Sequence, residues 1–163
     1  MTDLKLRSWA TFSEDGIYRY SLSREWEKGK GTINFLCLNP STADEQANDP
    51  TVERCQRRAI MWGYKRLVVT NIYAYRSTDP LQLRKYPQPR GPENNDYILR
   101  EAKAADVICC AWGNHGTLNR RAREVKTMLR LAGVELHVLR LSRRGIPCHP
   151  LYLPYSEGLK LWP

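Results

Sequence analysis

The sequence predicts an α/β protein: a three-layer α/β/α domain with a mainly parallel four-stranded sheet and one N-terminal antiparallel strand. Apolar runs occur four times, and the segments between them are each long enough for a crossover helix. The middle two runs are almost continuously apolar, which is typical of parallel strands buried on both faces. The four runs are Ile33–Leu38, Leu67–Tyr73, Val107–Trp112 and Glu135–Leu141.

The antiparallel strand is expected over residues 17–26, before the first apolar run. Tyr18, Tyr20 and Leu22 alternate with polar residues there. Lys28-Gly29-Lys30-Gly31 follows and supplies a turn into the sheet.

Helix start and stop signals lie in each crossover segment. The first helix is expected from Asp49, an N-cap followed by proline, to Gly63. In the second crossover, a helix start at residues 78–81 is followed by a Pro/Gly-rich loop and a helix over residues 95–105. The third helix is expected over residues 119–131, because apolar residues recur there at helical spacing.

Length and composition suit one domain over residues 1–163, since 42% of the chain is hydrophobic. No apolar run is long enough to cross a membrane, and the N-terminus lacks the hydrophobic region of a signal peptide. We therefore expect a cytoplasmic protein with no membrane partner. The five cysteines are an odd number in a chain without a secretory signal, so a disulfide framework is not expected. They have no ligand spacing such as C-x-x-C, so no metal or other cofactor is expected either.

The formal net charge is +9, and the basic residues are unevenly distributed. Between Leu118 and Gly145 the chain has eight basic and two acidic residues, and a second basic cluster lies between Arg54 and Arg66. Arginine forks suit phosphate, so DNA is the expected partner, with RNA or a free nucleotide as alternatives. A solvated basic surface would give the same composition.

Polar residues follow each predicted parallel strand, at the edge where open α/β sheets place their ligands. The loop Leu38–Asp44 also leads into a predicted helix N-terminus, which favours an anion. Because these strand ends share one edge of the sheet, we expect a ligand pocket there. The candidate residues are Asn39, Ser41, Thr42, Asp44, Asn71, Tyr73, Tyr75, Arg76, Gly113, Asn114, Arg143, Arg144 and His149.

Structural roles would account for several of these residues equally well. Ser41 and Asp44 have the spacing of a capping box. Asn39 precedes a proline and could hold a turn through its amide. Asn71 could make a hydrogen bond inside the core, where the two neighbouring tyrosines could also pack. Gly113 could simply permit a tight turn.

Motifs spread over nearly the whole chain are similar to those of the bacterial and phage domain-of-unknown-function family 1643. This resemblance implies no particular chemistry. The motifs are Arg19-Tyr20-Ser21-Leu22, Leu38-Asn39-Pro40-Ser41-Thr42-Ala43-Asp44, Asn48-Asp49-Pro50-Thr51, residues 71–80, Ala111-Trp112-Gly113 and His149-Pro150-Leu151-Tyr152-Leu153.

A more distant resemblance is to the uracil-DNA glycosylase superfamily, which has a parallel four-stranded α/β/α sheet. Leu38-Asn39-Pro40 resembles its catalytic loop, Thr70-Asn71-Ile72 its base-reading strand, Trp112-Gly113 its Leu-Gly motif and His149-Pro150 its late His-Pro-Ser loop. The departures are Leu38, Ser41 and Leu151, which stand where those motifs have glycine, glycine and serine.

The leading hypothesis is therefore hydrolysis of the N-glycosidic bond of a uracil-like or modified base. Asn39, Asp44 and His149 would be catalytic, orienting water and stabilising the departing base. The base would be held by Asn71, Tyr73, Tyr75, Gly113 and Asn114, and phosphates by Ser41, Thr42, Arg76, Arg143 and Arg144. Two alternatives are a non-catalytic nucleic-acid or nucleotide-binding module on the same fold, and an enzyme acting on a small phosphorylated metabolite.

Overall fold

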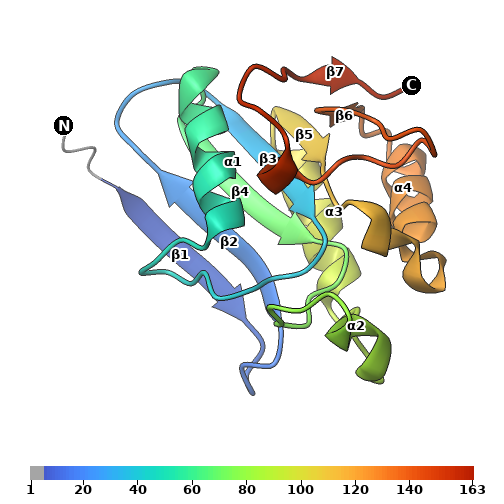
Figure 1. Ribbon diagram of the computed structural model, residues 1–163. Coiled ribbons are helices and arrows are strands. Elements are labelled where there is room, and N and C mark those ends of the chain that lie inside the picture. Colours follow the sequence, from blue (N-terminus) through green and yellow to red (C-terminus); the bar gives the residue numbers. More distant parts are fainter. Residues whose placement is uncertain (1–5) are drawn as a thin grey trace.

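The computed structural model describes residues 6–163 and contains one mixed seven-stranded sheet with helices on both faces (Figure 1). The strand order is β1-β2-β4-β3-β5-β6-β7. The predicted α/β class is confirmed. The sheet is larger and more mixed than the mainly parallel four-stranded sheet that the sequence predicts.

Four adjacent strands are parallel: β4 (Arg66–Asn71), β3 (Thr32–Cys37), β5 (Val107–Cys110) and β6 (Leu136–Val138). They correspond to the four predicted apolar runs, with earlier ends. β3 lies between β4 and β5 and is buried from Ile33 to Cys37. All four carboxyl ends therefore meet at one edge of the sheet.

The remaining three strands are antiparallel to their neighbours. β2 (Arg19–Glu25) lies within the strand predicted over residues 17–26, and it pairs with β4. β1 (Arg7–Phe12) pairs with β2, and β7 (Lys160–Leu161) pairs with β6. The last two escaped prediction because they are edge strands with largely exposed or half-buried residues and no apolar run.

The first predicted helix is α1 (Pro50–Met61). The Asp49 carboxylate accepts a hydrogen bond from the Val52 amide at 2.8 Å, and Gly63 has φ +82° in the turn that follows. Its buried residues Val52, Cys55 and Ala59 pack on one face of the sheet, against Phe35 and its neighbours in the core.

The other face is covered by α3 (Asn94–Ala104) and α4 (Arg121–Leu131), which contribute Ile98 and Val125 to a second core cluster. The sheet thus lies between two helical layers (Figure 1). The short helix α2 (Gln82–Lys85) and two 3-10 segments, η1 (Asn114–Arg120) and η2 (Pro150–Tyr152), lie in the connections. Within residues 6–163, no helix has the length and apolar character needed to span a membrane.

Candidate functional site

A pocket of about 550 Å³ lies at the carboxyl edge of the parallel strands. We call it the edge pocket. It is formed by the segments that follow β3, β4 and β5, by the N-terminus of α1, and by the chain around η2. Its lining residues are Leu38, Asn39, Ser41, Asp49, Pro50, Thr51, Ser77, Thr78, Pro80, Trp112, Gly113, Asn114, His115, Ser142, Cys148, His149, Leu151, Tyr152 and Leu153.

Five of the predicted site residues meet in this pocket. They come from three separate strand ends, so the rule that parallel strands deliver their polar residues to one edge holds for them. The five are Asn39, Ser41, Gly113, Asn114 and His149.

The Asn39 side chain connects two of these strand ends. Its Nδ2 donates to the carbonyl oxygens of Ser77 at 2.9 Å, of Pro40 at 3.2 Å and of Tyr75 at 3.4 Å. Within the described residues no hydrogen bond is made to its Oδ1. The amide group therefore holds the turn, as the structural alternative predicted, and it leaves an acceptor oxygen at the pocket wall.

His149 is held in one tautomer. It precedes η2, and its Nδ1 accepts a hydrogen bond from the Leu151 amide at 3.2 Å. Burial lowers its pKa to about 4, although the nearby Asp49 carboxylate opposes this shift. At neutral pH the ring is therefore uncharged, and because Nδ1 is an acceptor, the ring proton is on Nε2. The side chain can offer a single N–H donor.

Gly113 forms a turn beside His149, after the end of β5. Its φ of +76° is unfavourable for residues with a side chain, and its amide donates to the Pro147 carbonyl at 2.9 Å. A Cβ atom at this position would be 3.4 Å from the His149 Cβ. That separation is an ordinary contact, so the requirement for glycine comes from the backbone conformation of the turn.

Asp44 does not line the edge pocket. Its Oδ1 accepts hydrogen bonds from the amides of Gln46 at 2.8 Å and Ala47 at 2.9 Å, and these bonds lower its pKa. The carboxylate closes a local turn. The capping box with Ser41 is also absent, because α1 begins later and is capped by Asp49.

Asn71, Tyr73 and Tyr75 also lie outside the lining. Asn71 is 1% exposed, the Tyr73 hydroxyl donates to the Leu118 carbonyl, and the Tyr75 ring stacks on Tyr86 with centroids 4.0 Å apart. These residues stay inside because hydrogen bonding between β4 and the β3 segment continues as far as the Tyr73 amide. The chain therefore reaches the pocket only at Ser77.

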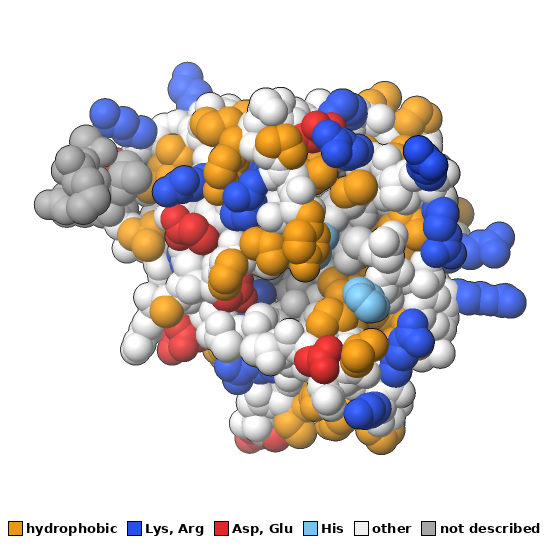
Figure 2. Space-filling view, viewed as in Figure 1, with side chains coloured by type: hydrophobic (Ala, Val, Ile, Leu, Met, Phe, Trp, Pro, Cys, Tyr) orange, Lys and Arg blue, Asp and Glu red, His pale blue; other side chains and the backbone are white. Residues whose placement is uncertain are grey.

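The predicted phosphate-binding residues are divided. Thr42 is exposed and outside the lining. Arg76 donates to the Gly16 carbonyl at 3.1 Å and its guanidinium lies over the Phe12 ring, so it faces β1. Arg143 and Arg144 are exposed and follow Ser142, which lines the pocket. Figure 2 shows Lys and Arg side chains projecting from the margin of this face.

Several lining residues were missed as site residues. Asp49 and Thr51 were interpreted only as a helix start, although a helix that follows β3 must begin at the same edge as the pocket. Ser77 and Thr78 lie beyond the predicted end of β4. Trp112 and Tyr152 also line the pocket, in segments that the sequence places at this edge, but their residue types alone indicate no binding role.

The edge pocket has almost no charged groups. None of its lining residues is Lys or Arg, and the single lining carboxylate, Asp49, is used in capping α1. Hydroxyl, amide and imidazole groups predominate instead. No cluster of three or more His, Cys, Asp or Glu suited to a metal ion occurs within residues 6–163.

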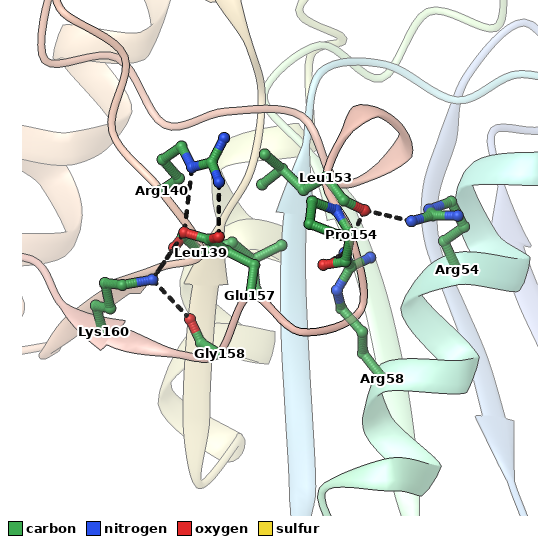
Figure 3. A network of polar contacts seen from close by, with 9 residues as sticks. All are labelled: Arg54, Arg58, Leu139, Arg140, Leu153, Pro154, Glu157, Gly158 and Lys160. Carbon is green, nitrogen blue, oxygen red and sulfur yellow. Dashed lines mark hydrogen bonds and ion pairs between the residues drawn. The ribbon is translucent and has the colours of Figure 1, made fainter.

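Buried arginines hold the loops around the pocket. Arg19 and Arg24 on β2 are each 1% exposed, and they donate to main-chain oxygens of Ala43, Asp44 and Ala47. On α1, half-buried Arg54 and buried Arg58 donate to the carbonyls of Pro150 and Leu153, and Arg58 also donates to that of Pro154. Figure 3 shows the contacts with Leu153 and Pro154.

Only part of the second basic cluster is exposed, since Arg57 and Lys65 lie at the surface. Arg58 is fully buried, and the guanidinium of Arg66 lies over the Trp9 ring. Sequence alone could not distinguish buried from solvated arginines.

Fold and site together define an α/β protein with a ligand-sized pocket at the carboxyl edge of a mixed sheet. The chain belongs to the family described as protein of unknown function (DUF1643), whose model matches residues 19–151. Comparisons with curated proteins and with solved structures find no match. The resemblance to the uracil-DNA glycosylase superfamily stays a prediction.

Proposed function

We propose that the edge pocket binds a nucleobase of DNA and that the protein hydrolyses its N-glycosidic bond. The observation that carries the proposal is His149, held as a neutral Nε2–H donor among the uncharged polar groups of the pocket. A neutral, preorganised donor is suited to an oxygen on which negative charge develops, because it needs no reorganisation during the reaction.

In the proposed reaction, the bond between the sugar C1′ and the base nitrogen breaks with its electron pair on the base. The His149 Nε2–H donates to the base oxygen on which this charge accumulates. Asn39 Oδ1 accepts a hydrogen bond from the attacking water, whose oxygen bonds to C1′. One proton of the water finally neutralises the base, and the other remains on the new sugar hydroxyl.

The composition of the pocket favours a base over a small phosphorylated metabolite. No cationic side chain that could pair with a phosphate group lines the pocket, and the α1 N-terminus there is already capped by the Asp49 carboxylate. The Tyr152 side chain lines the pocket and is 82% exposed, so its ring is available for stacking on a base. Arg143 and Arg144 lie just outside, where the sugar-phosphate backbone would pass.

A non-catalytic base-binding module is the second candidate. One observation favours it: the only carboxylate lining the pocket already caps α1. Hydrolysis would then depend on the imidazole and the amide alone. Binding and turnover must therefore be measured separately.

The test uses single-turnover base release and equilibrium binding on oligonucleotides that carry uracil or a modified base. For His149→Gln we expect roughly 100-fold slower release, because one preorganised donor is lost. Binding should change much less. His137→Gln is the matched control, since His137 lies on β6 outside the edge pocket.

Binding without release on every substrate would reject the hydrolase and support the binding module. Absence of binding by wild-type protein would reject both. If Arg143 and Arg144 contact phosphates, salt should weaken binding by the wild type. The Arg143→Gln/Arg144→Gln double variant should show a smaller dependence of affinity on salt.

A further inference from the structure

A second pocket, of about 360 Å³, lies at the start of α4. We call it the α4 pocket. The segment η1 connects the two pockets, with Asn114 in the edge pocket and Asn119 in the α4 pocket. The proposed base-binding function makes no use of it. It is lined by Tyr73, Pro87, Gln88, Pro89, Arg90, Gly91, Pro92, Asn119, Arg121 and Glu124.

Arg121 is a buried cation with incomplete pairing in this pocket. It is 2% exposed, its Nε donates to the Ile72 carbonyl at 2.7 Å, and its Nη1 donates to Glu124 Oε1 at 3.0 Å. Its Nη2 is buried and has no hydrogen-bond partner among the described residues. Burying such a donor unpaired costs free energy, which an incoming acceptor would recover.

The carboxylate that faces Arg121 is shared with a second guanidinium. Glu124 Oε1 is 3.5 Å from Arg90 Nη1, and the Glu124 and Arg90 side chains are 49% and 51% exposed. Two guanidinium groups therefore share one carboxylate. Because the Glu124 side chain is half-exposed, it can turn away from them into solvent. An anion that displaces Glu124 would gain both guanidinium groups and reach Nη2.

The N-terminus of α4 lies beside this pocket, because Asn119 and Arg121 both line it; the Arg121 amide itself already donates to the Gly116 and Leu118 carbonyls. The cap residue of α4, Arg120, has φ +57° and makes no side-chain capping bond, and Asn119 before it has φ +52°. Two consecutive non-glycine residues in this region are strained, and such strain concentrates at binding sites. The first-turn amides and the helix dipole favour an anion.

We propose that the α4 pocket is a binding site for a phosphate-type oxyanion, held by Arg90, by the Arg121 guanidinium and by the Ala122 and Arg123 amides. Glu124 occupies the site in the absence of the anion and turns into solvent when the anion enters. The site is distinct from the edge pocket and stands without the proposed reaction there.

The test is a titration of the wild-type protein with inorganic phosphate at constant ionic strength, followed by NMR of the Ala122 and Arg123 amides and the Arg121 guanidinium. Saturable shifts of all three are expected. Glu124→Gln should tighten binding and Arg90→Gln should weaken it, each by roughly tenfold for a single charge contact. Both side chains are half-exposed, so these variants should fold.

Lys103→Gln is the charge-matched control, because this exposed side chain on α3 lies outside the α4 pocket. Its affinity for phosphate should match that of the wild type. Absence of saturable shifts, or equal affinities in all the variants, would overturn the proposal.

The source of the oxyanion is found by competition. If a short single-stranded oligodeoxynucleotide displaces inorganic phosphate from the same amides, the site takes a phosphodiester. If only phosphate and phosphomonoesters bind, it takes a free phosphate group. Either result supports the site and assigns its ligand, and failure of all three to bind rejects it.

Discussion

The loop after β3, residues 38–49, and the carboxyl-terminal loop, residues 148–158, both line the edge pocket but are held differently. The buried Arg19 and Arg24 donate to main-chain carbonyls of the loop after β3. The carboxylates of Asp44 and Asp49 accept hydrogen bonds from main-chain amides of the same loop. No ion pair joins a residue of this loop within the described chain.

The carboxyl-terminal loop combines buried and exposed contacts. Arg58 holds its beginning from inside, whereas Glu157 near its end pairs with Arg140 at 2.8 Å and with Lys160 at 2.9 Å on the surface (Figure 3). It also carries Tyr152, which is 82% exposed. We infer that the loop after β3 is the fixed wall, and that the carboxyl-terminal loop is the wall that responds to solution conditions.

Removing the buried arginine that supports each loop should give the largest loss of stability. Arg24→Ala removes its hydrogen bonds to four residues. Arg58→Ala removes its bonds to three carbonyls, of which those of Pro150 and Leu153 still accept from Arg54. We expect the free energy of unfolding to fall by about 4 and about 3 kcal/mol, as measured by urea denaturation.

Arg57→Ala is the control, because its side chain is 66% exposed, and it should change stability by less than about 0.5 kcal/mol. Equal, small effects of all three substitutions would contradict the role given to the buried arginines.

Acid should lower the stability of the protein through His149, which lies in the carboxyl-terminal loop. Its pKa is about 4 in the folded protein, below the ordinary 6.5, so the unfolded chain binds more protons between these values. Stability should therefore fall as the pH is lowered from 6.5 to 4 and stay constant with respect to this group above 6.5. We expect His149→Asn to remove about 3 kcal/mol of this pH dependence. Identical pH dependence in the two proteins would show that the ring is not buried in its neutral form.

Salt should have the smallest effect, confined to the carboxyl-terminal loop. The ion pairs of Glu157 lower its pKa to about 2, but they lie at the surface and are screened by salt. Hydrogen exchange of amides 155–160 should accelerate in Glu157→Gln at low salt and match the wild type at high salt. Amides 43–48 should not respond. If exchange accelerated equally in both loops, the inference that only the carboxyl-terminal loop responds to salt would be wrong.

The sequence predicts the parts of this molecule that follow from local patterns. Asp49-Pro50 predicted the start of α1, and the apolar runs predicted all four parallel strands. The edge strands β1 and β7 could not be predicted, since their pairing partners rather than their own residues make them strands.

The candidate site was predicted in part for a similar reason. Asn39 and Gly113 lie close behind the ends of β3 and β5, so the topology brings them together. His149 is returned to the same edge by the turn that pairs Leu141 with Pro147. Asn71 and Tyr73 lie near the end of the apolar run that predicts β4, so the sequence places them at the edge; main-chain hydrogen bonding to the β3 segment continues as far as Tyr73 and keeps them inside. Arg58 and Arg121 were counted as surface charge, because burial of an arginine depends on carbonyls supplied by distant segments.

The buried arginines bond almost entirely to main-chain oxygens, and this has a consequence for how such a pocket can evolve. A carbonyl is present at every position, so most side chains of the supported loops can be exchanged without loss of these bonds. Residues such as Ser41, Leu151 and Tyr152 are therefore open to selection for a new ligand while the frame stays the same. Related chains could share one pocket shape and recognise different molecules.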